Sequence, residues 1–105
     1  MRIICVIFIL HLVLTTSAYC QQTAVDWKNK GDSLTAQGEY GEAIAAYDEA
    51  IRIDPNYAPA WSNKGNALKS QGEYYKAIQA YDEAIRLDSN STDVWINKGN
   101  ALMNQ

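Results

Sequence analysis

Histidine and cysteine are the side chains that most often act as general bases, nucleophiles or zinc ligands, and this 105-residue sequence holds very few of them. Its single histidine is His11, and its two cysteines are Cys5 and Cys20. All three lie in the first twenty residues, which differ in composition from the rest of the chain. The remainder lacks histidine altogether, so the sequence predicts no catalytic residue, no metal site and no cofactor.

Carboxylates are plentiful, but they follow helix surfaces rather than forming pairs. Glu39, Glu42, Asp48 and Glu49 fall mostly on the side of a predicted helix that faces away from its apolar residues. A solvated charged face explains this spacing better than an acid–base pair does. Because no nucleophile motif or phosphate-binding loop is present either, the sequence indicates that the protein is not an enzyme.

Asparagine recurs at one position with a fixed spacing of thirty-four residues, as Asn29, Asn63 and Asn97. An amide side chain offers both a hydrogen-bond donor and an acceptor, so a row of amides can hold the backbone of an extended peptide. The same asparagines can instead be framework residues that support the helices carrying them. The residues alone leave both interpretations open.

Asn90, Ser91 and Thr92 fit the N-x-[ST] acceptor pattern for N-glycosylation. The motif falls between two predicted helices, which makes Asn90 a candidate for modification. The alternative is turn and cap chemistry, in which Ser91 or Thr92 accepts a bond from the first backbone N–H groups of the next helix. This alternative is favoured, because so short a motif carries little information.

The first twenty residues have the pattern of a secretory signal peptide. A single basic residue, Arg2, precedes an apolar run from Ile3 to Leu14, and small or hydroxyl residues follow. Cleavage is predicted after Ala18 or after Cys20. The alternative is an uncleaved membrane anchor, although the run is short of the roughly 20 residues needed to span a bilayer. Either way, the remainder is predicted to be secreted or extracytoplasmic, because the only nearby positive charge precedes the segment.

Removal of this leader changes the charge and the redox chemistry of the chain. Eight basic residues would then face twelve acidic ones, a balance that disfavours nucleic acid as a partner. At most one cysteine would remain, so no disulfide could form within the chain. The stability of the folded part must therefore come from packing.

The polar residues are carried by an internal repeat. The sequence WKNKGDSL begins at Trp27, WSNKGNAL at Trp61 and WINKGNAL at Trp95. Residues 27–60 and 61–94 are identical at twenty of thirty-four positions, and residues 95–105 match 61–71 at eight of eleven. The chain therefore contains two full repeats and the first third of another.

Each full repeat predicts two helices. In the first repeat, apolar residues follow one another in steps of three and four, as expected for one face of a helix: Ala43, Ile44, Tyr47, Ala50 and Ile51. Gly38 predicts the end of the helix before it, and Pro55 the end of the helix after it. Asp48 and Arg52 are expected to pair one turn apart. The predicted helices are 24–37, 40–53, 58–71, 74–87 and 92–104.

This pattern resembles the tetratricopeptide repeat family, whose unit of 34 residues carries W-x2-L-G-x2-Y, then A-x3-F, then P. The matching positions are Trp27, Gly31, Ala43, Tyr47, Ala50 and Pro55 in the first copy, Trp61, Gly65, Ala77, Tyr81 and Ala84 in the second, and Trp95 and Gly99 in the third. The departures are Lys30, Lys64 and Lys98 for the leucine before the glycine, Leu34, Leu68 and Leu102 for the first tyrosine, and Ser89 for a proline.

The resemblance implies an all-α solenoid of antiparallel helix pairs with a lone final helix. The module would span 24–105, with repeats at 24–57 and 58–91 and a partial repeat at 92–105. Small residues, such as Gly31 and Ala43, would let paired helices approach closely, and the three tryptophans would fill the space between layers. In this family the first helices line a concave groove that binds peptides. The implied groove residues are Lys28, Asn29, Asp32, Asn63, Asn66, Lys69, Asn97 and Asn100.

One family function is a clamp for the acidic C-terminal tails of heat-shock chaperones. The clamp needs a lysine and an asparagine in the first layer, an asparagine in the second, and a lysine and an arginine in the third. Lys28 and Asn63 match, but Asp32, Asp93 and Asn97 stand where asparagine, lysine and arginine are needed. Because two acids would repel a bound carboxylate, the sequence argues against the clamp.

The sequence thus predicts a non-catalytic module that binds a protein or peptide segment, with no nucleic-acid partner and with membrane contact only through an uncleaved leader. Its last helix carries several apolar residues that lack a partner helix in the repeat pattern: Val94, Trp95, Ile96, Leu102 and Met103. The alternatives are therefore a structural element that forms homo-oligomers through this helix, or the remnant of a longer array.

Overall fold

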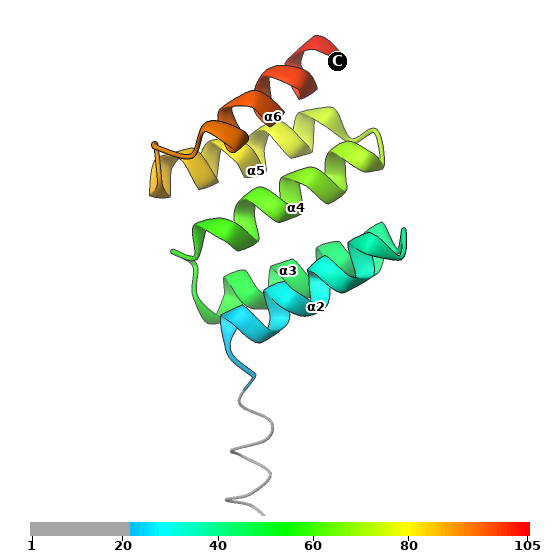
Figure 1. Cartoon of the computed structure of the whole chain (residues 1–105), viewed down its shortest axis with the longest axis vertical. Coiled ribbons are helices and arrows are strands. Elements are labelled where there is room, and N and C mark those ends of the chain that lie inside the picture. The colour runs from blue at the N-terminus through cyan, green and yellow to red at the C-terminus, as the bar shows by residue number, and fades with distance from the viewer. Residues whose placement is uncertain (1–21) are drawn as a thin grey trace, which may run out of the picture.

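The computed structural model describes residues 22–105, and every regular element in this range is an α-helix (Figure 1). The helices are α2 (Ala24–Ala36), α3 (Tyr40–Ile53), α4 (Ala58–Ser70), α5 (Tyr74–Leu87) and α6 (Thr92–Met103). The all-α prediction is confirmed, and each predicted helix ends within one residue of its observed position. The predicted signal or anchor segment, residues 1–20, lies outside the described residues. Within the described residues, no helix combines the length and the apolar character needed to cross a membrane.

Two glycines make the tight turns that fold each pair of helices back on itself. Gly38 and Gly72 both have φ of +79°, a left-handed conformation that residues with a Cβ atom rarely adopt. After α2, the backbone N–H of Glu39 donates to the Leu34 carbonyl at 2.9 Å, which closes the turn. The predicted end of the first helix at Gly38 is confirmed, and the same turn recurs at Gly72.

The helix caps agree with the sequence-based predictions less well than the turns do. At the start of α2, Thr23 and Asp26 form a reciprocal capping box, in which each side chain accepts a bond from the backbone N–H of the other. Ser91 occupies the cap position of α6, but its side chain makes no capping bond there. The predicted cap by Ser91 or Thr92 is therefore wrong.

The second helix of each pair, α3 or α5, ends in the same way, although only α3 is followed by a proline. Asp54 and Asp88 adopt extended backbone conformations after α3 and α5. Their carboxylates accept bonds from the backbone N–H groups of Asn56 and Asn90, each at 3.1 Å. An aspartate turn therefore ends both helices, which explains why Ser89 can stand in the position of Pro55.

The helices stack as a continuous array of antiparallel pairs. Each helix contacts the next along the chain, and α2, α4 and α6 also contact one another in a row. Figure 1 shows α2, α4 and α6 on one face of the array, with α3 and α5 behind them. We call the surface formed by α2, α4 and α6 the first-helix face. The predicted groove residues all lie on these three helices.

Tyrosine, rather than tryptophan, fills the closest contacts of the core. Tyr47 and Tyr81 are the largest fully buried side chains of the described residues. Their rings lie directly over Gly31 and Gly65, so close that a Cβ atom on Gly65 would lie 2.5 Å from the Tyr81 Cε1 atom. The predicted close approach of the paired helices at these glycines is therefore confirmed.

The predicted tryptophan wedges are only partly correct. Trp27 and Trp61 are half-buried at the edges of the core clusters, while Trp95 is 49% exposed. The indole N–H of Trp61 donates to the Pro55 carbonyl, and that of Trp95 donates to the Ser89 carbonyl, both at 2.9 Å. Because each indole reaches back to the loop before its own helix, the tryptophans connect consecutive pairs from the side.

The expected ion pair between Asp48 and Arg52 is also wrong. Arg52 binds Glu49 instead, three residues earlier on the same helix. Asp48 faces α4, where its carboxylate lies 2.6 Å from the Lys64 ammonium. Asp82 and Lys98 form the same contact between α5 and α6, also at 2.6 Å. Helix packing therefore redirects this aspartate from its own helix to the next one.

Candidate functional site

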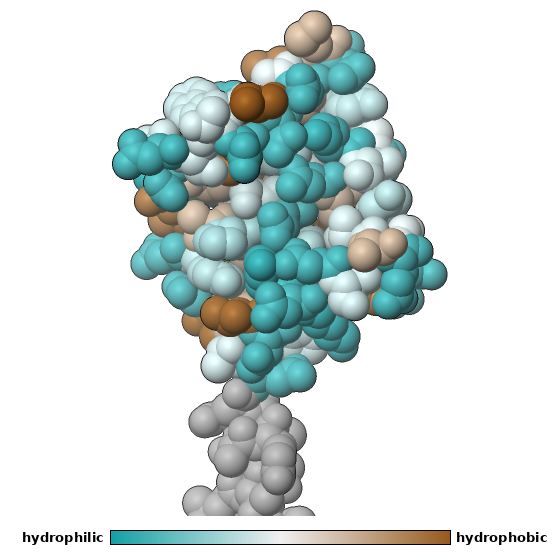
Figure 2. Space-filling model, in the orientation of Figure 1, coloured by the Kyte–Doolittle hydropathy of each residue, from teal (hydrophilic) through white to brown (hydrophobic). Residues whose placement is uncertain are grey.

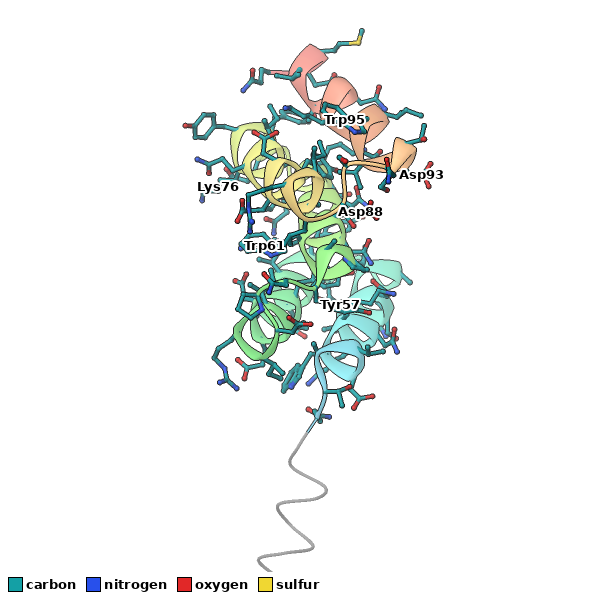
Figure 3. All side chains as sticks on the ribbon, turned by 90° about the vertical axis from the view of Figure 1, so that its left-hand side faces the viewer. Tyr57, Trp61, Lys76, Asp88, Asp93 and Trp95 are labelled. Carbon is teal, nitrogen blue, oxygen red and sulfur yellow. The ribbon has the colours of Figure 1, made fainter. Side chains whose placement is uncertain are left out.

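The first-helix face is mainly polar. Figure 2 shows hydrophilic residues over most of the surface formed by α2 and α4, with hydrophobic residues exposed at the α6 end and near the start of α2. Figure 3 places Asp93 on one side of the array and Lys76 on the opposite side, which distinguishes this face from the outer surface of α5. The three helices that carry the predicted binding residues therefore form one surface.

At the α2 end of this face, Asp32 gathers three donors around one carboxylate. The Tyr47 hydroxyl donates to Asp32 Oδ1 at 2.7 Å, and the amide of Asn63 donates to the same oxygen at 2.8 Å. The Lys28 ammonium lies 2.8 Å from the other oxygen. Lys28 and Asn63, the two residues that match the chaperone-tail clamp, are thus both bound to a carboxylate that belongs to the protein itself.

The second repeat has the same tyrosine contact, but there the acceptor is a neutral amide instead of a carboxylate. The Tyr81 hydroxyl donates to Asn66 Oδ1 at 2.6 Å, in the place of the bond from Tyr47 to Asp32. The Lys69 ammonium donates to Asn97 Oδ1 at 3.1 Å and so connects α4 to α6. In both amides the oxygen is used, which leaves the NH2 groups of Asn66 and Asn97 as donors for another molecule.

The two buried tyrosines remain neutral donors over the ordinary pH range. Burial raises the pKa of the Tyr81 hydroxyl well above its usual value. Burial is also the main cause of the raised pKa of Tyr47, to which the hydrogen bond and the charge of Asp32 add, while the nearby Thr35 hydroxyl opposes them. Each tyrosine therefore fixes the orientation of its acceptor on the first-helix face.

A pocket of about 340 Å³ opens between α4 and α6. It is lined mainly by amides and hydroxyls, with one carboxylate and two aliphatic side chains: Ser62, Asn63, Asn66, Ser91, Asp93, Val94, Ile96 and Asn97. The amide groups left by the internal bonds therefore meet in one hollow. Its chemistry suits hydrogen bonding to peptide groups, because these present alternating N–H donors and C=O acceptors.

The structure brings together some of the predicted site residues and separates others. Asn63, Asn66 and Asn97 line the pocket, while Lys28 and Asp32 bind each other beside it. Asn29 and Asn100 are exposed and do not line the pocket between α4 and α6. Of the predicted asparagine row, Asn63 and Asn97 therefore meet at this pocket, and Asn29 lies outside it.

Sequence reasoning did not identify Ser91 as a pocket residue or the hydroxyls of the two buried tyrosines as part of this surface. One signal was available for the tyrosines. Tyr47 follows Asp32 by fifteen residues, and Tyr81 follows Asn66 by the same interval. An equal spacing in two copies of a repeat indicates an equal contact. Ser91 gave no such signal, because the fold alone brings its loop to the end of α4.

The described residues around the pocket offer mainly hydrogen-bonding groups. Nowhere in residues 22–105 do three or more histidine, cysteine, aspartate or glutamate side chains form a group that could hold a metal ion. The Asp32 carboxylate is already bound by a lysine, a tyrosine and an asparagine. The arrangement can bind and orient another molecule.

Two family models match the chain. The model described as TPR repeat matches residues 31–72, and the model described as Tetratricopeptide repeat matches residues 58–91. Together they cover more than half of the 105 residues. None of the curated proteins matches the chain at a significant level.

Solved structures of similar fold include the Sgt2 TPR domain from Aspergillus fumigatus, which is 27% identical with a TM-score of 0.74. The match covers 77% of this chain but only 54% of that one, so this chain spans about half the length of the Sgt2 domain. The second TPR of Spaghetti (RPAP3), bound to the HSP90 peptide SRMEEVD, is 25% identical with a TM-score of 0.76 and coverage of 83% and 81%.

The TPR2B domain of yeast Sti1, from a complex with pHsp70, is 28% identical with a TM-score of 0.74, and the match covers 76% of this chain and 64% of that one. The fold shared by these proteins is a non-catalytic one, and two of the three structures were solved as complexes with another peptide or protein. The paired helices, the glycine and tyrosine contacts between them and both model matches place this chain in the tetratricopeptide repeat family.

Proposed function

We propose that the first-helix face binds an extended segment of another protein, with the pocket between α4 and α6 as its centre. The observation that supports this most directly is the set of amide NH2 groups that the internal bonds leave in one hollow, on Asn66 and Asn97. An extended peptide presents backbone carbonyls that can accept from such amides. The likeness to TPR domains solved with peptides supports the same function.

The segment bound here would differ from the acidic peptide in the Spaghetti complex. At the α2 end, Lys28 and Asn63 already bind Asp32. An incoming carboxylate would have to displace this one and would be repelled by its charge. Asp93 adds a second negative charge at the pocket. We therefore expect a partner held by its backbone and by neutral or basic side chains rather than by a terminal carboxylate.

Replacing Asn97 by alanine is expected to weaken binding about fivefold or more, because one hydrogen bond to the peptide is lost. Asn97 is better suited to this test than Asn63. The amide of Asn63 holds the Asp32 carboxylate, so its removal would also cost stability, at roughly 1.5–3 kcal/mol for a bond to a charged group. Fluorescence titration with ten-residue peptides, acetylated and amidated at their ends and selected from a library, measures the change.

Asn56→Ala is the matched control, because this exposed asparagine lies in the turn before α4 and does not line the pocket. It should leave both affinity and the unfolding midpoint unchanged. Asn97→Ala also loses the bond from Lys69, so the affinities are compared at a temperature where both variants are fully folded. Equal affinity in the Asn97 and Asn56 variants would show that the pocket does not bind the peptide.

Because export of the mature chain is proposed from residues 1–20, natural partners are best captured from an extracytoplasmic fraction.

A second candidate function is self-association through α6. Four large apolar side chains of this helix are exposed: Trp95, Ile96, Leu102 and Met103. Exposed apolar residues that gather on one surface commonly mark a contact with another molecule. In this interpretation the protein is a structural element that forms homo-oligomers, and the first-helix face has no ligand of its own.

Sedimentation equilibrium over a range of concentrations tests the second candidate. If α6 pairs with a second copy, Ile96→Glu and Met103→Glu are expected to convert the oligomer to a monomer, because a charge would be buried in an apolar contact. Tyr75→Glu is the control, since the exposure of Tyr75 lies between those of Ile96 and Met103 but Tyr75 is on α5. A chain that is monomeric at every concentration excludes this function and leaves peptide binding untouched.

A further inference from the structure

The α6 helix is held against α5 in the same way that α4 is held against α3. The indole N–H groups of Trp61 and Trp95 make equivalent bonds at 2.9 Å. Lys64 and Lys98 make equivalent ion pairs at 2.6 Å, and each ammonium lies over the tryptophan of its own helix, at 5.6 and 5.7 Å from the ring centre. Trp95 and Lys98 of α6 are therefore already placed as Trp61 and Lys64 are in the complete repeat.

The side of α6 that faces away from these contacts differs from the corresponding side of α4. In the second repeat, α5 covers the corresponding side of α4 and leaves Leu68 only 6% exposed. Leu102 occupies the same position one repeat later, and it is 50% exposed. Among the described residues α6 contacts only α5 and α4, so this side of the helix is uncovered (Figure 1).

Gly99 lies on this uncovered side, and the space above it is of the kind that a tyrosine ring fills in the complete repeats. Cβ atoms built on Gly31 and Gly65 would collide with the rings of Tyr47 and Tyr81, whereas a Cβ atom on Gly99 would have nothing within 4 Å. The residue after each glycine, Asp32 or Asn66, accepts the tyrosine hydroxyl in the complete repeats. Asn100 holds this position beside Gly99 and is exposed.

The two covering helices within the chain show which residues such a contact needs. Each places a tyrosine between two alanines, with the first alanine four residues before it and the second three residues after it: Ala43, Tyr47 and Ala50 on α3, and Ala77, Tyr81 and Ala84 on α5. All six are at most 1% exposed. The alanines let the helix approach closely, and the tyrosine occupies the space above the glycine.

We propose that the uncovered side of α6 docks a helix from a second polypeptide that carries an Ala-x3-Tyr-x2-Ala face, with the tyrosine ring over Gly99 and its hydroxyl on the amide of Asn100. This names the occupant of the surface considered for self-association and does not depend on peptide binding at the first-helix face. The contact continues, in a third copy, the α2–α3 and α4–α5 interfaces of the chain. The tyrosines of a second folded copy are already buried in its own repeats, so a folded second copy does not supply this helix.

The probe is a fluorescent peptide with the sequence of Tyr40–Ile53, held helical by a side-chain bridge on its outer face, titrated against the chain. Saturable binding is expected. Replacing the tyrosine of the peptide that corresponds to Tyr47 by alanine should weaken it at least about tenfold, as for an aromatic anchor in an interface. Absence of saturable binding, or equal binding by both peptides, would overturn the proposal.

Gly99→Ala in the protein separates docking from folding. The new Cβ atom meets nothing in the free chain, and alanine favours helix over glycine, so the unfolding midpoint should not fall. The same atom would collide with a docked ring, so peptide affinity should drop at least about tenfold. Gly41→Ala, on the open side of α3, should leave affinity unchanged.

Two other results contradict the proposal. If Gly99→Ala binds the peptide as well as the original chain does, the ring does not occupy this position. If the chain forms dimers that Ile96→Glu disrupts but that neither the peptide nor Gly99→Ala affects, the surface binds a second α6 helix. Either result leaves the peptide-binding function of the first-helix face standing, because that function is measured at Asn97.

Discussion

Replacing Tyr81 by alanine is expected to lower the free energy of unfolding by about 3–5 kcal/mol, the usual cost of removing a large buried aromatic side chain. The Tyr81 side chain is fully buried, and its ring packs over Gly65 between α4 and α5. Alanine would leave a cavity there and would also remove the donor to Asn66. Because a small domain is stable by only about 5–15 kcal/mol in total, the variant should be close to unfolding at room temperature.

Urea denaturation followed by circular dichroism measures this loss. Tyr75→Ala is the matched control, since Tyr75 lies on the same helix but is 67% exposed, and it should change the midpoint little. If the two variants had the same midpoint, Tyr81 would not be the residue that joins this pair of helices. Trp61→Ala should cost less than Tyr81→Ala, because the indole is only half-buried.

The second large effect is expected for Gly65→Ala, at about 1–3 kcal/mol of lost stability, as for other overpacked cores. The added Cβ atom would lie 2.5 Å from Cε1, 2.7 Å from Cδ1 and 3.0 Å from Cζ of the Tyr81 ring. A fully buried ring cannot move away without shifting α5. The gain in helix propensity from glycine to alanine, about 1 kcal/mol, offsets only part of this cost.

Gly41→Ala tests whether the loss comes from the ring rather than from the change of residue type. Gly41 lies in the first turn of α3, where a Cβ atom would meet only the Gln71 side-chain amide, at 3.8 Å. This variant should be as stable as the original chain or slightly more so. A Gly65 variant that unfolds at the same urea concentration as the Gly41 variant would contradict the close packing of Tyr81 on α4.

A core of small residues and tyrosines, together with a polar first-helix face, explains how such a small array can be stable and leave polar groups for the proposed binding. Contacts among alanine, glycine and tyrosine residues hold the helix pairs together. The helices α2, α4 and α6 therefore need few apolar residues on the first-helix face. That side is then left to polar groups such as Asn66 and Asn97, whose orientations are fixed by bonds from Tyr81 and Lys69. Binding groups that are already oriented lose less entropy when a partner binds.

The sequence by itself determined the helices and their order, while their antiparallel pairing was implied by the resemblance to the repeat family. These follow from local patterns: the three- and four-residue apolar steps that include Ala43 and Tyr47, the left-handed turns at Gly38 and Gly72, and the thirty-four-residue repeat. Such signals lie within one helix or one turn, so they can be recognised without knowing what packs against them. The repeat likewise placed the candidate binding residues on the first helices.

Only the tertiary structure decided which of these residues act together. Asp32 and Asn63 are thirty-one residues apart, and their bond exists because α2 and α4 are packed side by side. Asp48 pairs with Lys64 rather than Arg52 for the same reason, and Trp95 is exposed because no described helix covers that side of α6. Contacts between helices depend on the direction and distance of side chains in space, which a periodic pattern along the chain does not specify.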